Sequence, residues 1–175
     1  SRYLDFVLVV LRAFGFSFEV PVAVVVLGLL RWVTVEQMRE AVNVTIRGFG
    51  DVARSLPLAK RHERGERIVE TAFFARARLE GYDLGYDTIA ASGAHACTLH
   101  WTRNDGEVRE SDLILVDAGV ELDSLYTADV TRTIPVSGKF TKRQKEVYNA
   151  VLRVMRNSIA GLIPGKLPKD WQKEA

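Results

Sequence analysis

Hydrophobic positions in the segment after residue 33 recur with the spacing of an amphipathic helix. Thr34 can cap the N-terminus of this helix, and Gln37 follows at the capping-box position. Pro57 predicts that the helix ends near Leu56. The apolar face would consist of Val35, Met38, Val42, Ile46 and Phe49.

Two further helices are predicted by the same periodicity. One covers roughly residues 66–80 and ends at Gly81, with apolar side chains on one face. The other begins after a cap at Thr141 and ends near Gly161. Their apolar positions include Ile68, Val69, Ala72, Phe73 and Ala77 in the first, and Val147, Val151, Val154 and Ile159 in the second.

The segment between these helices changes to the period of short strands. Asn104-Asp105-Gly106 is a strong turn signal within it. Helices followed by a run of strands predict an α+β domain, with helices on one face of a mainly antiparallel sheet. The predicted strands are residues 88–91, 97–101, 113–116, 122–126 and 130–136.

Residues 1–33 form a separate, very apolar segment of unclear origin, and residues 34–175 form the folded domain. Asp5, Arg12 and Glu19 interrupt the apolar runs, and Pro21 lies inside the second run. A membrane-spanning helix needs roughly 18–20 consecutive apolar residues, so we expect no stable membrane span here. Two buried strands, or a strand and a short helix, are the favoured interpretation.

The overall charge gives no reason to expect a nucleic-acid partner. The chain of 175 residues has 24 basic and 22 acidic residues, for a net charge of +2. Cys97 is the single cysteine, so no intrachain disulfide can form, which favours a reducing, cytoplasmic compartment. Cys97 itself is expected to be a small buried residue beside a strand.

Asp117 and Asp129 are the strongest candidates for chemistry, because both interrupt predicted strands. A carboxylate among apolar neighbours is costly unless a cation or hydrogen bonds compensate it. Two carboxylates on neighbouring strands could hold a divalent metal ion, although each could instead cap a turn. Eleven residues separate the two, which also suggests a long hairpin turn around residues 122–126.

Longer stretches around these aspartates carry a family resemblance. They are Asp117-Ala-Gly, Asp129-Val-Thr-Arg-Thr, Leu99-His100-Trp101 and Pro135-Val-Ser-Gly-Lys-Phe. Together they resemble the pita-bread metallopeptidases, which include aminopeptidase P, prolidase and methionine aminopeptidase. The third and fourth are closest to aminopeptidase P, and the resemblance covers roughly residues 35–165.

The resemblance implies half of a pita-bread fold and a hydrolase. Asp117 and Asp129 would be ligands of two divalent ions, most often Mn²⁺, and His100 would donate a hydrogen bond to substrate or intermediate. The family's metal-bound hydroxide hydrolyses the N-terminal Xaa-Pro bond of peptides with proline in second position. His62 and His95 lack the family context of His100, and we expect both in solvent-facing loops.

The remaining family ligands have no counterpart in this sequence. They are a histidine in a Gly-x-x-His segment and two glutamates, whereas Gly165 is followed by only ten residues without these motifs. We therefore expect this chain alone to be weakly active or inactive. The alternative is a non-catalytic peptide- or protein-binding module of the same fold. Self-association, or association with a missing C-terminal half, is a further expectation.

Overall fold

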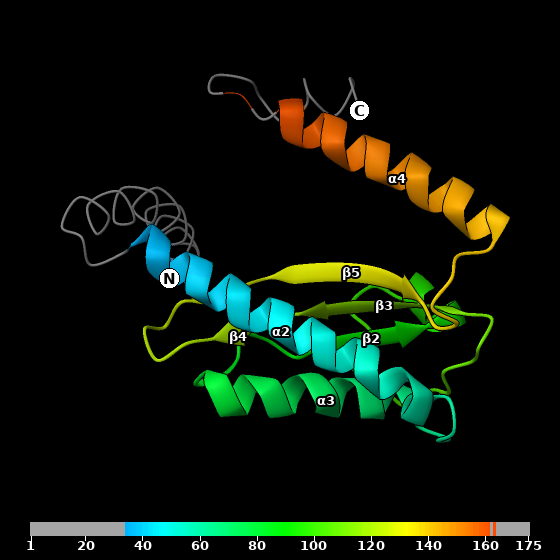
Figure 1. Cartoon of the computed structure of the whole chain (residues 1–175), viewed down its shortest axis with the longest axis horizontal. Helices are drawn as coiled ribbons and strands as arrows, with labels where there is room; N and C mark the ends of the chain where they lie inside the picture. The colour runs from blue at the N-terminus through cyan, green and yellow to red at the C-terminus, as the bar shows by residue number, and fades with distance from the viewer. Residues whose placement is uncertain (1–33, 162, 164–175) are drawn as a thin grey trace, which may run out of the picture.

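The computed structural model describes residues 34–161 and residue 163, and Figure 1 shows their arrangement. Residues 1–33 lie outside the described residues, and so do the two strands, or strand and helix, expected there. Element labels follow Figure 1, and the elements in chain order are α2 (Val35–Ala59), α3 (Gly65–Glu80), β1 (Asp83–Leu84), β2 (Ile89–Ser92), the 3-10 helix η1 (Gly93–Cys97), β3 (Leu113–Ala118), β4 (Val120–Glu121), β5 (Val130–Pro135) and α4 (Lys142–Gly161).

Helix α2 begins as its sequence predicts but ends later. The Gln37 amide donates to the Thr34 hydroxyl, and the Gln37 side chain accepts from the Thr34 amide, which completes a capping box. The predicted end before Pro57 is wrong, because α2 continues through this proline to Ala59. Pro57 lacks an N–H, but Leu56 and Ala59 on either side are buried and hold the last turn in place.

Helix α3 packs closely against α2, and Gly48 permits this close packing. A Cβ atom on Gly48 would lie only 2.6 Å from Cε2 of Phe73, a fully buried side chain of α3. Phe49 meets Phe73 edge to face, with ring centroids 5.8 Å apart. The predicted bounds of α3 and its end at Gly81 are confirmed.

The sheet is antiparallel, with strand order β2-β3-β5, and β1 pairs separately with β4. The predicted strands near residues 88–91, 113–116 and 130–136 are confirmed within a few residues. The predicted strands at 97–101 and 122–126 are wrong. The first segment is partly 3-10 helix and turn, and the second is the turn between β4 and β5, as the spacing of the aspartates suggested.

The two faces of β3 have different environments. Ile114, Val116 and Ala118 are fully buried and belong to the core formed with α2 and α3. Leu115 and Asp117 alternate with them and are only half-buried on the opposite face. An α+β domain with α2 and α3 on one face of an antiparallel sheet is thus confirmed, and Asp117 projects away from the apolar core.

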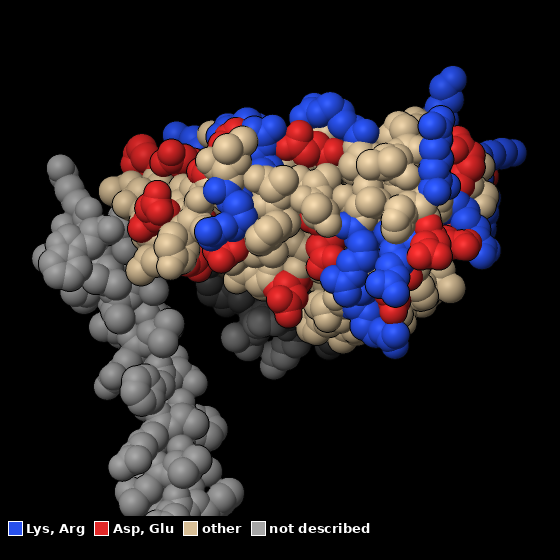
Figure 2. Space-filling model, turned by 90° about the horizontal axis from the view of Figure 1, so that it is seen from below, with Lys and Arg blue, Asp and Glu red and all other residues tan. Residues whose placement is uncertain are grey.

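Basic and acidic side chains form a connected set of ion pairs on the outer surface of α2 and α3. Arg76 of α3 bonds Asp51 of α2 at 2.6 Å and also pairs with Glu80, which in turn accepts a hydrogen bond from Arg47. Figure 2 shows basic and acidic side chains next to one another on the face that it displays. None of the described helices is long and apolar enough to cross a membrane.

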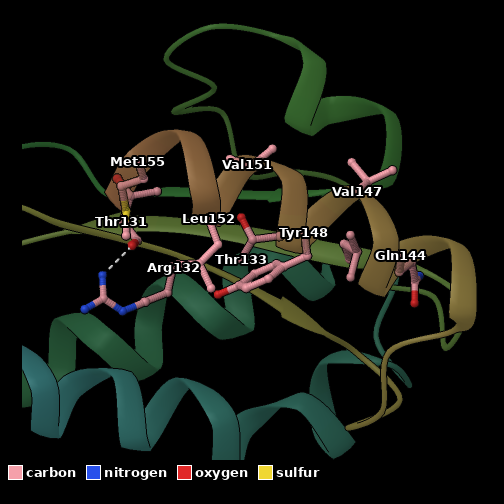
Figure 3. A pocket seen from close by; sticks show the side chains of 10 residues that line it. Thr131, Arg132, Thr133, Gln144, Val147, Tyr148, Val151, Leu152 and Met155 are labelled. Carbon is pink, nitrogen blue, oxygen red and sulfur yellow. Dashed lines mark hydrogen bonds between the residues drawn. The ribbon is translucent and has the colours of Figure 1, made fainter. Parts of the chain in front are cut away.

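Helix α4 lies beyond β5 across an apolar groove (Figure 3). The groove has a volume of about 450 Å³ and is lined mainly by one face of α4 and the exposed side of β5. Among the described residues, no carboxylate, cysteine or histidine lines it. Its lining includes Thr131, Thr133, Val147, Tyr148, Val151 and Met155.

Candidate active site

Asp117 and Asp129 come together because β3 and β5 are neighbours. Asp117 lies on β3 opposite Thr131, and Asp129 directly precedes Val130, which pairs with Ala118. Both carboxylates face one cavity of about 400 Å³. The chain therefore unites the two predicted aspartates at a single site.

Gly119 allows the two segments to approach one another. A Cβ atom at this position would lie 1.6 Å from the carbonyl oxygen of Ala128, the residue before Asp129. The Ala128 amide also donates to the Val120 carbonyl at 3.1 Å. The glycine after Asp117-Ala118 is thus required by the close contact that brings Asp129 next to Asp117.

Tyr86 joins the two carboxylates through its hydroxyl group. The hydroxyl oxygen lies 2.6 Å from Oδ1 of Asp117 and 2.9 Å from Oδ1 of Asp129. Its one proton can be donated to only one of these oxygens at a time. Burial raises the pKa of Tyr86 above its usual range, and the hydrogen bonds to Asp117 and Asp129 raise it further, so the hydroxyl remains protonated.

His100 lines the same cavity from a loop, and the strand predicted around it is absent. Its φ angle of 53° places its backbone in the left-handed region, and the residue is exposed to solvent. Thr102 follows it into the cavity lining, together with Asp87. The site thus contains the three candidates from the sequence, His100, Asp117 and Asp129.

The loop that carries His100 is tied to Glu66, a fully buried residue at the start of α3. Four donors from the loop surround the Glu66 carboxylate, which explains how a carboxylate can be buried without a metal ion. They are the amides of Ser92 and Gly106, each at 2.8 Å, Nδ1 of His95 at 2.9 Å and Nε1 of Trp101 at 3.0 Å.

Two expectations for this loop are wrong. His95 is not a free solvent-facing side chain, because it bonds Glu66 and stacks on Trp101 with ring centroids 4.0 Å apart. Cys97 is exposed rather than buried, because η1 turns it outward where a strand was predicted. His62 is exposed in the loop after α2, as predicted.

Tyr86 and Glu66 were not identified from the sequence as site residues. Tyr86 follows Gly85 in a short turn-rich segment, where a tyrosine has no distinguishing local pattern. Glu66 opens a helix, where an acidic residue is common for reasons of the helix dipole. Their partners are 26 to 43 residues away in the chain, so only the folded structure reveals their contacts.

The side chains at the cavity are of the right chemical type to bind a divalent metal ion, but too few of them are grouped to complete a site. Carboxylate oxygens are the ligands that Mn²⁺ and Mg²⁺ prefer, and the carboxylates of Asp117 and Asp129 line one open cavity, together with Asp87. Across residues 34–161 and 163, however, no group of three or more histidine, cysteine, aspartate or glutamate side chains is arranged to hold a metal. Asp117 and Asp129 can therefore supply part of a metal site.

Comparison with protein families gives two matches along the chain. Residues 36–175 match the model of metallopeptidase family M24. Residues 1–53 match the model of the Sec-independent protein translocase protein TatC. The second match includes Thr34 and most of α2, and its remaining residues, 1–33, lie outside the described part of the chain.

Curated relatives are similar over most of this chain but are much longer. Xaa-Pro aminopeptidase 1 of Streptomyces coelicolor is 50% identical over 135 residues, which are 77% of this chain and 27% of the relative. Xaa-Pro aminopeptidase 2 of the same organism is 52% identical over 139 residues, which are 79% of this chain and 29% of the relative. The chain thus spans less than a third of these relatives.

Solved structures of aminopeptidases share the fold. Aminopeptidase PepP of Pseudomonas aeruginosa superposes with a TM-score of 0.66 at 29% identity, over 79% of this chain and 30% of that protein. Zinc-substituted aminopeptidase P of Escherichia coli, in complex with product, gives a TM-score of 0.60 at 34% identity. The superposition covers 71% of this chain and 27% of that protein. The half pita-bread fold expected from the sequence is confirmed, and the chain belongs to metallopeptidase family M24 and resembles the N-terminal part of the Xaa-Pro aminopeptidase catalytic domain.

Proposed function

We propose that this chain carries the first part of the active site of a metal-dependent Xaa-Pro aminopeptidase. The observation that carries the proposal is the convergence of Asp117, Asp129 and His100 on one cavity, with the Tyr86 hydroxyl between the two carboxylates. Membership of a metallopeptidase family and about 50% identity to Xaa-Pro aminopeptidases support it.

In this proposal Asp117 and Asp129 hold a pair of divalent ions, with Mn²⁺ as the proposed metal. Divalent ions at such a site activate water and polarise a carbonyl group. Tyr86 fixes the direction of both carboxylates, because its hydroxyl is within hydrogen-bond distance of one oxygen of each. The remaining carboxylate oxygens are then available as ligands.

His100 is proposed to bind the substrate rather than the metal. It reaches the cavity from the loop between β2 and β3, whereas the aspartates belong to β3 and the start of β5. From there, its imidazole can donate a hydrogen bond to the carbonyl oxygen of the peptide bond under attack. The proposed substrates are peptides with proline at the second position, and Escherichia coli aminopeptidase P, a relative of this chain, is known in complex with the inhibitor Pro-Leu.

We further propose that residues 1–175 alone have little or no peptidase activity. Asp87 also lines the cavity, but the described residues hold no group of three or more histidine, cysteine, aspartate or glutamate side chains that could bind a metal, and the two proposed ligands alone leave a weak site for which water competes. The same observation favours the second candidate function, a peptide- or protein-binding module of this fold. The division at residues 33 and 34 and a cytoplasmic location remain part of the proposal.

Calorimetric titration with Mn²⁺ tests the metal site. We expect weak binding to the wild-type chain and at least about tenfold weaker binding to Asp117→Ala, because one of the two ligands is lost. Asp123→Ala is the matched control, since Asp123 is an exposed aspartate in the turn between β4 and β5, and it should bind Mn²⁺ like the wild type. Equal affinity of the wild-type and Asp117→Ala proteins would overturn the proposed site.

A peptidase assay with an Xaa-Pro peptide and added Mn²⁺ tests the activity of the chain by itself. We expect turnover close to the uncatalysed rate. Robust turnover that Asp117→Ala abolishes would show that the chain is a working enzyme and that the expected inactivity is wrong.

A further inference from the structure

The loop from Ser92 to Gly106 places His100 at the cavity, although it has little regular structure of its own. It contains only the short helix η1, and residues 96–100 are exposed to solvent. The left-handed φ of His100 is unfavourable for a residue with a side chain. Contacts outside the loop must therefore maintain this conformation.

The Glu66 carboxylate provides these contacts at both ends and in the middle of the loop. Its Oε1 accepts from the Ser92 amide and from His95, and its Oε2 accepts from Trp101 and from the Gly106 amide. The Glu66 amide also donates to the Gly106 carbonyl at 3.1 Å. One buried side chain therefore closes a loop of 15 residues into a fixed ring.

The contact to Trp101 is the one nearest to His100. Trp101 follows His100 directly, and its ring is held between the stacked imidazole of His95 and the hydrogen bond to Glu66. With the indole fixed, the backbone of the preceding residue has little freedom. Asn104 adds a second anchor, since its side chain accepts from the Ala90 amide and donates to the Thr88 carbonyl.

We propose that Glu66 is the positioning residue for His100 and that it holds this histidine at the cavity without contacting the substrate. The proposal rests on the proposed function in one respect, namely that His100 acts at the cavity of Asp117 and Asp129. The fixation of the loop by Glu66 is independent of metal and substrate and can be measured separately.

Glu66→Gln is the most informative substitution because it conserves shape and removes acceptor capacity. The carboxylate accepts four hydrogen bonds, whereas the amide group has one acceptor oxygen and an NH₂ group that donates. Whichever way the amide turns, its NH₂ group faces a backbone N–H, either that of Ser92 or that of Gly106. At least one end of the loop is therefore released.

Hydrogen exchange and the indole N–H signal of Trp101 measure this release by NMR. In Glu66→Gln we expect at least about tenfold faster exchange at the Ser92 or Gly106 amide, a shift of the Trp101 indole signal, and unchanged exchange in α2 and β3. Glu70→Gln is the matched control, because it makes the same change one turn further along α3, at a residue whose one ion pair within the described part of the chain is with Arg67. Unchanged exchange and an unchanged indole signal in Glu66→Gln would overturn the proposal.

Trp101→Phe decides the question if Glu66→Gln does not fold. Phenylalanine retains a ring that can stack on His95 but has no N–H to donate to Glu66. We expect a folded protein with altered His100 signals and with the Ser92 and Gly106 amides still protected. Unaltered His100 signals in this variant would contradict a positioning role.

Line broadening by Mn²⁺ separates this proposal from the proposed function. In the wild-type chain, bound Mn²⁺ should broaden the imidazole signals of His100 more than those of His62, which lies outside the cavity. If His100 is not broadened, the proposed metal site fails while the exchange results still decide the role of Glu66. If Glu66→Gln loosens the loop but leaves the broadening of His100 unchanged, Glu66 does not position His100.

Discussion

Two regions of the molecule hold carboxylates in opposite ways. Glu66 is fully buried and accepts four hydrogen bonds from one loop. Asp117 and Asp129 are half-buried and exposed, respectively, and share the single hydroxyl of Tyr86. Both regions face the same loop, since it carries the donors to Glu66 and brings His100 to the aspartates.

The difference shows how a carboxylate can serve structure or ligand binding. Every oxygen of Glu66 is occupied by protein donors, so this group has no capacity left for a metal ion or substrate. Among residues 34–161 and 163, the aspartates have one protein donor between them, the Tyr86 hydroxyl, and both open onto a cavity, so acceptor capacity is left on their oxygens. The first region stabilises the fold, whereas the second is suited to bind a cation.

Removal of the Glu66 side chain should have the largest effect on stability. Glu66→Ala leaves four donors without their acceptor, two of them backbone amides at the ends of the loop. We expect the free energy of unfolding to fall by about 3–5 kcal/mol, measured by chemical denaturation. The control Glu70→Ala should lose less than about 1 kcal/mol. If Glu66→Ala and Glu70→Ala lowered the free energy of unfolding by similar amounts, the special structural role of Glu66 would be contradicted.

Removal of the Tyr86 hydroxyl should have a smaller effect that depends on pH. Tyr86→Phe should cost about 1 kcal/mol at pH 7, because one hydrogen bond to the carboxylates is lost. The pKa of Tyr86 is raised in the folded state above its ordinary value of 10.0. The stabilisation is therefore fully present below pH 10 and decreases as the pH rises through the higher folded-state value.

Denaturation curves of both proteins between pH 7 and pH 11 measure this difference. The gap between the wild type and Tyr86→Phe should be constant up to about pH 10 and should narrow above it. Tyr82→Phe is the control, since Tyr82 is exposed, and it should alter stability by less than about 0.5 kcal/mol. A gap that widens above pH 10 would contradict the assigned direction.

The smallest effect is expected for Asp51, a carboxylate of a third kind on the surface of the helix pair. The hydrogen bond from Arg76, followed by that from Arg54, lowers the pKa of Asp51 from 3.8 to about 2. Its contribution is therefore present above pH 3.8 and is lost as the pH falls toward 2. Asp51→Asn should lower the free energy of unfolding by at most about 1 kcal/mol at pH 7. It should also make stability depend less steeply on pH between about pH 4 and pH 2, as followed by circular dichroism. An unchanged acid transition would show that this pair contributes nothing.

Local patterns predicted most of the regular structure. Helices α2 and α4 have apolar side chains at helical spacing and recognisable caps at Thr34 and Thr141, so their starts were predictable from a few adjacent residues. Pro57 misled the prediction of the end of α2, because burial of Leu56 and Ala59 outweighs the loss of one hydrogen bond. The strands β2, β3 and β5 follow the period of two.

The loop around His100 could not be predicted from local pattern. The alternation at residues 97–101 is typical of a strand, but hydrogen bonds to Glu66 impose a different conformation. The premise that Asp117 is packed among apolar side chains was also wrong, since β3 turns it to the opposite face from Val116. Asp117 and Asp129 were identified by their position in predicted strands together with the family resemblance, and His100 by the resemblance, whereas Tyr86 and Glu66 required the fold.

The side chain of Asn104 protects the free edge of β2. Within the described residues, β2 pairs only with β3, so the Thr88 carbonyl and the Ala90 amide point away from the sheet. Asn104 satisfies both with its own amide group, as a neighbouring strand would. An open edge of this kind is a template for pairing with another chain. Asn104 therefore occupies two of the backbone groups through which a further strand would pair with β2, in addition to anchoring the loop that it belongs to.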